Sequence, residues 1–98
     1  MDVRSLKQFV NLSESLHFGR ASKASYVSAS ALSRSIRRLE DELGVTLFER
    51  NNRSVSLTHA GDLFLGYARE ALGEWDAIRN RLMQHKGELH GEVSMYCS

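Results

Sequence analysis

The sequence lacks the residues and patterns that several common classes of protein require. Cys97 is the one cysteine among 98 residues, which excludes an internal disulfide and any zinc ribbon or redox site built on a CxxC pair. No run of about 18 apolar residues is present, and the first residues carry no long apolar core behind a basic flank. We therefore expect neither a membrane span nor a signal peptide, and a reducing, cytoplasmic location.

Catalytic and metal-binding patterns are equally scarce. The serines form no GxSxG motif, and no GxxxxGK loop is available to hold phosphate. Among the four histidines, His85 and His90 come nearest to a metal-ligand spacing, but no cysteine or acidic cluster supports them. We therefore predict that the chain is not an enzyme and that it binds neither a metal nor a cofactor.

Charge is unevenly distributed, although the formal net charge is only +1. Residues 1–58 carry nine basic against six acidic side chains, a net +3, and residues 59–98 carry four against six, a net −2. Between residues 16 and 39 there is no acid, and the basic side chains there are Arg20, Lys23, Arg34, Arg37 and Arg38. Such a run favours contact with phosphate, because a solvated surface usually mixes both signs.

The spacing of apolar residues predicts three helices in the first half of the chain. Asp2 can cap a helix that ends near Ser15, and a short helical pattern follows at residues 21–24. Ser28 can cap a third helix, and Gly44 suits its end because glycine accepts the left-handed conformation. A short helix, a tight turn and a longer helix make a helix-turn-helix.

A hairpin and a long helix are predicted next. Residues 46–49 and 55–57 match two short strands around an asparagine-rich turn, which would form a wing. Thr58 can cap a helix whose apolar residues follow alternating steps of four and three: Phe64, Ala68, Ala71, Trp75, Ile78 and Leu82. We predict that this seam packs against a second copy of the chain; the alternative is packing within one chain.

The predicted fold is therefore mainly α, a winged helix-turn-helix of three helices plus a β-hairpin wing, followed by a long dimerisation helix. We expect a DNA-binding domain at residues 1–58 and a linker or dimerisation helix at residues 59–85. Residues 86–98 contain two glycines and then alternate at Val93, Met95 and Cys97. We interpret them as a hinge and the first strand of a further domain that is truncated here.

One face of the third predicted helix carries the residue types that read DNA. On a helical wheel, Leu32 and Ile36 lie opposite Arg34, whereas Ser30, Arg37 and Arg38 lie within roughly 60° of it. Small residues let a helix start enter the major groove, and guanidinium groups reach guanine edges or phosphates. The alternative is an ordinary solvated face, balanced by the acids at residues 40–42.

The wing carries two arginines. Arg53 lies in the predicted turn, where a guanidinium would suit a narrow, electronegative minor groove. The alternative is a plain turn residue. Arg50, at the start of the turn, is the second candidate.

Residues 28–61, SASALSRSIRRLEDELGVTLFERNNRSVSLTHAG, resemble the helix-turn-helix and wing of LysR-type transcriptional regulators. The opening DVRSLKQFVNLSESLHFGRAS resembles their first two helices. Matching the family residue by residue implies base contacts at Ala29, Ser30, Ser33 and Arg34. Many members have Gln-Pro where this chain has Ala29 and Ser30, which removes an amide that could read adenine. The candidate DNA-binding residues are thus Arg20, Lys23, Ser28, Ala29, Ser30, Ser33, Arg34, Arg37, Arg38, Arg50 and Arg53.

The resemblance also implies partners. Members of the family bind inverted-repeat operators in double-stranded DNA as homodimers or tetramers, and RNA polymerase is a further expected partner. The combination of HFGRAS, NNRSVSLT and GEVSMYCS resembles members that activate the isomeroreductase step of branched-chain amino-acid synthesis. Their small-molecule inducer, an acetohydroxy acid, would bind a C-terminal domain outside this chain. The alternatives are a LysR-type regulator of a different pathway and a dimerisation or scaffold module without specific DNA binding.

Overall fold

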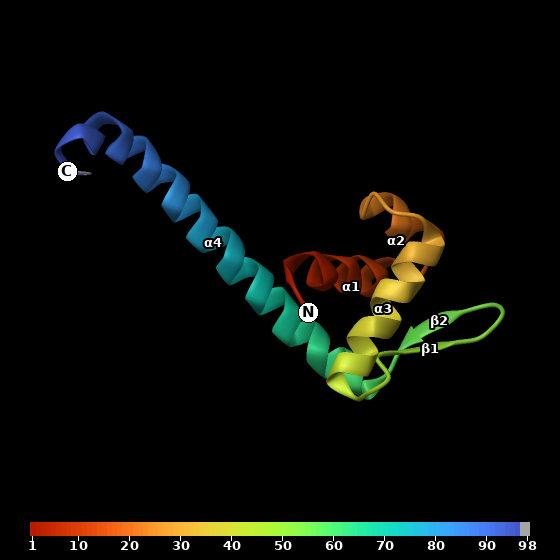
Figure 1. The fold of residues 1–98 in the computed structure, drawn as a ribbon. Coiled ribbons are helices and arrows are strands. Elements are labelled where there is room, and N and C mark those ends of the chain that lie inside the picture. The colour runs from red at the N-terminus through yellow and green to blue at the C-terminus, as the bar shows by residue number, and fades with distance from the viewer. Residues whose placement is uncertain (97–98) are drawn as a thin grey trace.

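Three short helices, a hairpin and one long helix make up the part of the chain that the structure describes. The computed structural model describes the backbone of residues 1–96 and the side chains of residues 1–85. The elements are α1 (Val3–Ser15), α2 (Phe18–Ala24), α3 (Ala29–Leu43), β1 (Phe48–Arg50), β2 (Val55–Leu57) and α4 (His59–Tyr96). The hairpin projects from one side of the three helices, and α4 extends away on the other side (Figure 1). The predicted winged helix-turn-helix followed by a long helix is confirmed.

Each helix that was predicted from a cap begins at that cap. The side chain of Asp2 accepts a hydrogen bond from the backbone N–H of Ser5, and Ser28 Oγ accepts one from Ala31. Thr58 Oγ1 accepts one from the N–H of Gly61 in the first turn of α4. The bonds from the backbone and then the side chain of Ser5 lower the pKa of Asp2. The capped carboxylate therefore stabilises α1 above its unfolded-state pKa and loses that effect as pH falls through the lowered value.

The core lies where α1, α3, the wing and the start of α4 meet. Phe9 is fully buried there, with its ring centroid 5.4 Å from that of Phe48 in β1 and 5.0 Å from that of Phe64 in α4. Gln8 is also buried, and its side-chain oxygen accepts a hydrogen bond from the hydroxyl of Ser35 in α3. The buried apolar residues are Leu6, Phe9, Leu12, Ala21, Leu32, Ile36, Leu39, Leu47, Phe48 and Ala68.

The wing is a two-stranded antiparallel hairpin in which Phe48 pairs with Leu57 and Arg50 with Val55. The prediction that the first strand starts at residue 46 is wrong: β1 begins at Phe48, because Thr46 and Leu47 form hydrogen bonds with Thr58 and Glu40. The N–H groups of Leu47 and Phe48 donate to the carboxylate of Glu40, and the hydroxyl of Thr58 donates to the carbonyl of Thr46. The chain between α3 and the wing is thus tied to the two helices on either side of it.

Helix α4 continues to Tyr96, so the predicted hinge and strand in residues 86–96 are wrong. An isolated strand leaves its backbone N–H and C=O groups without partners, whereas a helix pairs them within the segment. Gly87 and Gly91 each cost a helix only about 1 kcal/mol relative to alanine, which is too little to end it. Cys97, the last position of the predicted alternation, lies outside the described residues.

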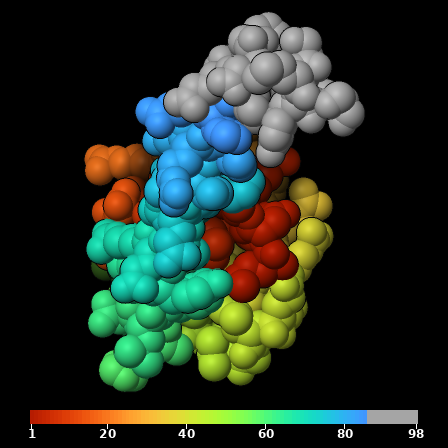
Figure 2. Space-filling view, turned by 90° about the vertical axis from the view of Figure 1, so that its left-hand side faces the viewer, coloured from red at the N-terminus to blue at the C-terminus, as the bar shows by residue number. Residues whose placement is uncertain are grey.

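The predicted heptad seam on α4 divides into two parts. Ala68 is buried, and Phe64 and Ala71 pack against the core of their own chain. Figure 2 shows this near half of α4 lying against α1. The prediction that all six seam residues face a second chain is wrong for Phe64 and Ala68, which pack on the core of their own chain. Ala71 is half-buried and also lines the groove beside Trp75, so its contact with a second copy stays a prediction. Trp75, Ile78 and Leu82, farther along, are 42%, 42% and 58% exposed.

The close approach of α4 to the wing depends on a glycine. A Cβ at Gly61 would lie 2.2 Å from the carbonyl oxygen of Leu47 and 2.7 Å from Cδ1 of Leu57. We therefore expect Gly61→Ala to lower the free energy of unfolding by about 1–3 kcal/mol, as overpacking does. Gly66→Ala is the matched control, because nothing lies within 4 Å of its added Cβ, and should raise stability by up to about 1 kcal/mol.

Urea unfolding followed by circular dichroism, at one fixed protein concentration, measures both variants. Equal shifts in the same direction would contradict the contact between α4 and the wing.

Candidate nucleic-acid interface

Helix α3 presents one apolar and one polar face, as predicted from the helical wheel. Leu32, Ile36 and Leu39 are buried against the core. The opposite side is exposed and begins with small residues at the start of the helix, followed by arginines one and two turns later: Ser28, Ala29, Ser30, Arg34 and Arg37. No bulky side chain stands at the helix start, so α3 has the shape needed to enter the major groove.

The start of α3 is also electrically suited to an anion. The first turn of this 15-residue helix holds no acidic residue, so the partial positive charge of its free N–H groups is not neutralised there. The hydroxyl groups of Ser28 and Ser30 lie 3.3 Å apart beside it. Arg20 and Lys23 on α2 are exposed as well. A phosphate backbone that passes this end of the helix-turn-helix would meet positive charge and hydroxyl donors.

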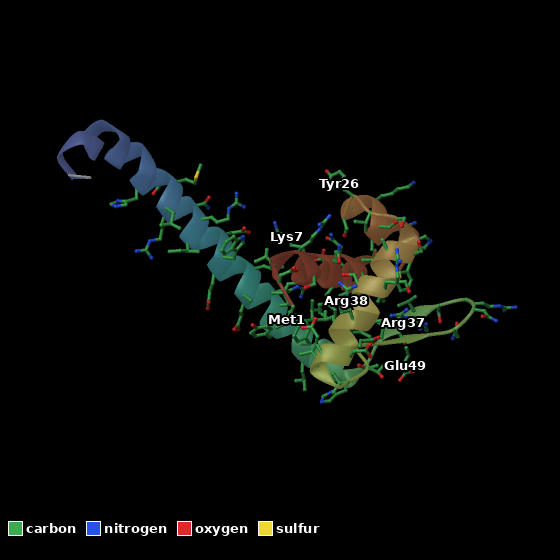
Figure 3. All side chains as sticks on the ribbon, in the orientation of Figure 1. Met1, Lys7, Tyr26, Arg37, Arg38 and Glu49 are labelled. Carbon is green, nitrogen blue, oxygen red and sulfur yellow. The ribbon has the colours of Figure 1, made fainter. Side chains whose placement is uncertain are left out.

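The two neighbouring arginines of α3 point to different sides. Figure 3 shows Arg37 on the side of α3 nearer the wing and Arg38 on the side nearer α1. Arg38 lines a hollow between the two helices together with Asp2, Arg4 and Glu42. Both arginines are exposed. Arg37 therefore lies on the wing side of the predicted DNA-binding face, and Arg38 at its edge toward α1.

The wing places Arg53 far from the core. Asn51 forms the turn, since its side-chain oxygen accepts hydrogen bonds from the N–H groups of Arg53 and Ser54, each at 2.8 Å. Arg53 is exposed near the tip of the hairpin, which projects beyond α3 (Figure 1). An extended arm that ends in a guanidinium can reach the groove beside the one that α3 enters.

Arg50 does not join this surface, contrary to the prediction. Its side chain is 22% exposed and points back into the molecule, where one guanidinium nitrogen donates to the hydroxyl of Ser33 at 3.0 Å. The other lies 3.6 Å from the carboxylate of Glu40, and the guanidinium sits 5.1 Å from the ring centroid of Phe18. A carboxylate and an aromatic face hold the cation inside the domain. Ser33, also a predicted DNA contact, is half-buried by the same arrangement.

Glu40 and Tyr26 are two residues that the sequence reasoning did not single out. In the sequence, Glu40 was interpreted only as a counter-charge for the arginines, yet it joins α3 to the wing. Its partners lie seven to ten residues away in a non-helical segment, so no local sequence pattern reveals them.

Tyr26 is 94% exposed in the turn between α2 and α3, with a left-handed φ of 58°. The sequence feature that could have drawn attention to Tyr26 is that it is a large aromatic residue in a stretch of small residues.

The part of the chain that the structure describes contains no group of three or more histidine, cysteine or acidic side chains placed to hold a metal ion. Within the same residues, no helix combines the length and the apolar character that crossing a membrane requires.

Comparison with known proteins gives consistent matches. The family profile described as "Bacterial regulatory helix-turn-helix protein, lysR family" matches residues 3–62. The HTH-type transcriptional activator IlvY of Salmonella typhimurium is 47% identical over all 98 residues, which cover 33% of its length. The HTH-type transcriptional regulator HdfR of Salmonella newport is 44% identical over the same span and 34% of its length. The solved CbnR DNA-binding domain in complex with DNA has a TM-score of 0.82 and 35% identity, covering 87% of this chain and 98% of that one.

Arg34 is the residue on which specific DNA contact should depend most. It is exposed at the middle of the polar face of α3, opposite Leu32 and Ile36. We expect Arg34→Ala to weaken binding to a preferred DNA sequence by about 1–3 kcal/mol, the contribution of one bidentate base contact, and binding to random DNA far less. Arg69→Ala on α4 is the control, since it removes an exposed arginine from outside this face.

Titration of labelled duplexes at fixed salt gives both affinities. Equal losses on preferred and random DNA would reassign Arg34 to a phosphate contact.

Proposed function

Because the chain belongs to the LysR family of bacterial helix-turn-helix regulators, we propose that it directs a transcription activator to the control region for branched-chain amino-acid synthesis. The chain is the DNA-binding domain of a LysR-type transcriptional regulator, and it spans about a third of the length of the curated relatives it matches. The target, the assembly and the inducer are the proposed parts.

One observation carries the proposal. The exposed face of α3 and the tip of the wing offer separate arginines, Arg34 and Arg53, from two elements that are fixed to each other through the core. Two such points suit a major groove and its neighbouring minor groove better than they suit a small ligand or a flat protein surface. The fold match to a domain solved on DNA supports the same reading.

The pathway is proposed from sequence. The identity to IlvY and the segments HFGRAS and NNRSVSLT favour regulation of the isomeroreductase step. The inducer would then be an acetohydroxy acid, bound by a C-terminal domain outside this chain, and RNA polymerase would be the protein that the activator recruits. The similar identity to HdfR makes regulation of another pathway the competing candidate.

A nuclease footprint tests the target. We expect the chain to protect an inverted repeat in the control region of the isomeroreductase gene of its source organism, and not a shuffled duplex of equal composition. The logarithm of the affinity should fall linearly with the logarithm of the salt concentration, because the DNA releases counterions when the protein contacts its phosphates. Protection elsewhere in the genome but not at this region would contradict the pathway. An absence of salt dependence on any duplex would contradict DNA binding itself.

We further propose that the chain acts as a dimer joined through the far half of α4. The exposed Trp75 and Ile78 line a largely apolar groove between α4 and α1. Its other lining residues are Val3, Leu6, Ala71, Leu72 and one acid, Glu74. Leaving such a stripe in water costs roughly 25 cal/mol per Å² of apolar surface, so a second copy is the natural cover. Two linked domains also bind two half-sites with an effective concentration that separate monomers lack.

Acidic substitutions in this groove should separate the copies. We expect Trp75→Glu with Ile78→Glu to lower the association constant at least about 100-fold, since each buried carboxylate would cost several kcal/mol. The winged domain should stay folded, because Phe64 and Ala68 still anchor α4 to α1. Ala77→Glu with Asn80→Glu is the control, because it adds the same charge on the opposite side of the helix at about 100° per residue.

Sedimentation measures the mass of both variants, and circular dichroism confirms that they are folded. A folded groove variant that still sediments as a dimer would place the contact between copies elsewhere.

A further inference from the structure

Arg50 joins three elements from inside the domain. It leaves β1, stacks over Phe18 of α2, donates to Ser33 of α3 and faces Glu40 near the end of the same helix. A guanidinium is a planar fork of donors, so it can serve two partners at once in a fixed geometry. The position of Arg50 thus fixes the direction from which Ser33 receives its hydrogen bond.

Glu40 keeps Arg50 in this position. One carboxylate oxygen accepts hydrogen bonds from the N–H groups of Leu47 and Phe48 at 2.8 and 3.2 Å, and the other faces the guanidinium at 3.6 Å. The Glu40 side chain is only 15% exposed. If Arg50 swung out toward solvent, a mostly buried carboxylate would lose its counter-charge, which is costly. Arg50 is therefore held inside rather than free to contact DNA.

With Arg50 as its partner, the hydroxyl of Ser33 acts as an acceptor within the protein. A hydroxyl has one hydrogen to donate and two lone pairs that accept, whereas a guanidinium only donates. Ser33 accordingly accepts from Arg50 and keeps its own hydrogen. Two other helical serines, Ser13 and Ser22, donate theirs to carbonyls of the preceding turn of their own helices. In the described residues Ser33 makes no such bond, so its hydrogen is available to an external acceptor.

We propose that Arg50 is a positioning residue for DNA specificity, which presents the hydroxyl of Ser33 as a hydrogen-bond donor to the edge of a base in the major groove. Ser33 lies on α3 next to Ser30 and Arg37, three and four residues away on the same side of the helix. The acceptor is N7 of a purine, O6 of guanine or O4 of thymine. The inference rests on α3 being the DNA-reading helix, and Arg50 itself touches no DNA.

Selection from a random-sequence duplex library tests this role. The wild-type chain, Arg50→Met, Ser33→Ala and the double variant are each used to enrich duplexes, and the base preference at every position is compared. We expect Arg50→Met and Ser33→Ala to lose about fivefold preference at the same one or two base pairs, the size of one hydrogen bond. The double variant should lose no more than Ser33→Ala alone, because Arg50 acts through that hydroxyl.

Arg53→Met is the matched control, the same change at an exposed wing arginine. It should alter preferences only in the flanks and leave the positions sensitive to Ser33 unchanged. Thermal unfolding verifies that each variant is folded. If Arg50→Met is not, Arg50→Lys replaces it, since one ammonium opposite Glu40 cannot also hold Ser33 in the fork geometry.

The outcomes are separable. Additive losses in the double variant, or a uniform loss at all positions with Arg50→Met, would show that Arg50 merely supports the fold. An unchanged preference profile in Ser33→Ala would show that Ser33 reads no base. If the wild-type chain enriches no duplex at all, the proposed function fails together with this inference.

Discussion

The structure depends on the burial of one ring, that of Phe9, at the point where three parts of the chain meet. Its neighbours are Phe48 from the wing and Phe64 from α4, at distances typical of tilted and edge-on aromatic pairs. Such pairs contribute beyond the area they bury, and they have defined geometry. The helix-turn-helix, the wing and the long helix therefore share one core, so the positions of Arg34 and Arg53 relative to each other are set by packing.

Polar contacts add direction to this packing. The apolar core brings α3 and β1 together. The carboxylate of Glu40 then fixes the segment between them, because it accepts hydrogen bonds from the N–H groups of Leu47 and Phe48. Arg50 then spans the remaining space between the wing and α3. Arg50 is thereby paired inside the domain, whereas Arg34 and Arg53 are exposed. Nine of the eleven candidate residues are exposed, and the other two, Ser33 and Arg50, are partly buried and hydrogen-bonded to each other.

Local signals in the sequence predicted local structure well. Asp2, Ser28, Gly44 and Thr58 mark helix boundaries correctly, because a cap acts on backbone groups only two or three residues away. Features that depend on distant partners were predicted less well. The helical wheel separated the two faces of α3, but it could not show that Glu40 would draw Arg50 inward. The heptad pattern on α4 likewise could not show that α1 covers its first half. The alternation after residue 91 predicted a strand, which needs a neighbouring strand to pair with, and the described residues there form a helix instead.

The unbroken course of α4 has a mechanical consequence. Its 38 residues amount to about 57 Å along the helix axis, and its near half is anchored in the core at Phe64 and Ala68. Because the segment is helical, one inserted residue would turn the part of α4 beyond it by about 100° and advance it by about 1.5 Å. A substitution on the exposed surface of α4 leaves the rotation and position of the rest of the helix unchanged. The middle of α4 should therefore accept many substitutions but few insertions or deletions, and those it accepts should come in lengths close to whole turns.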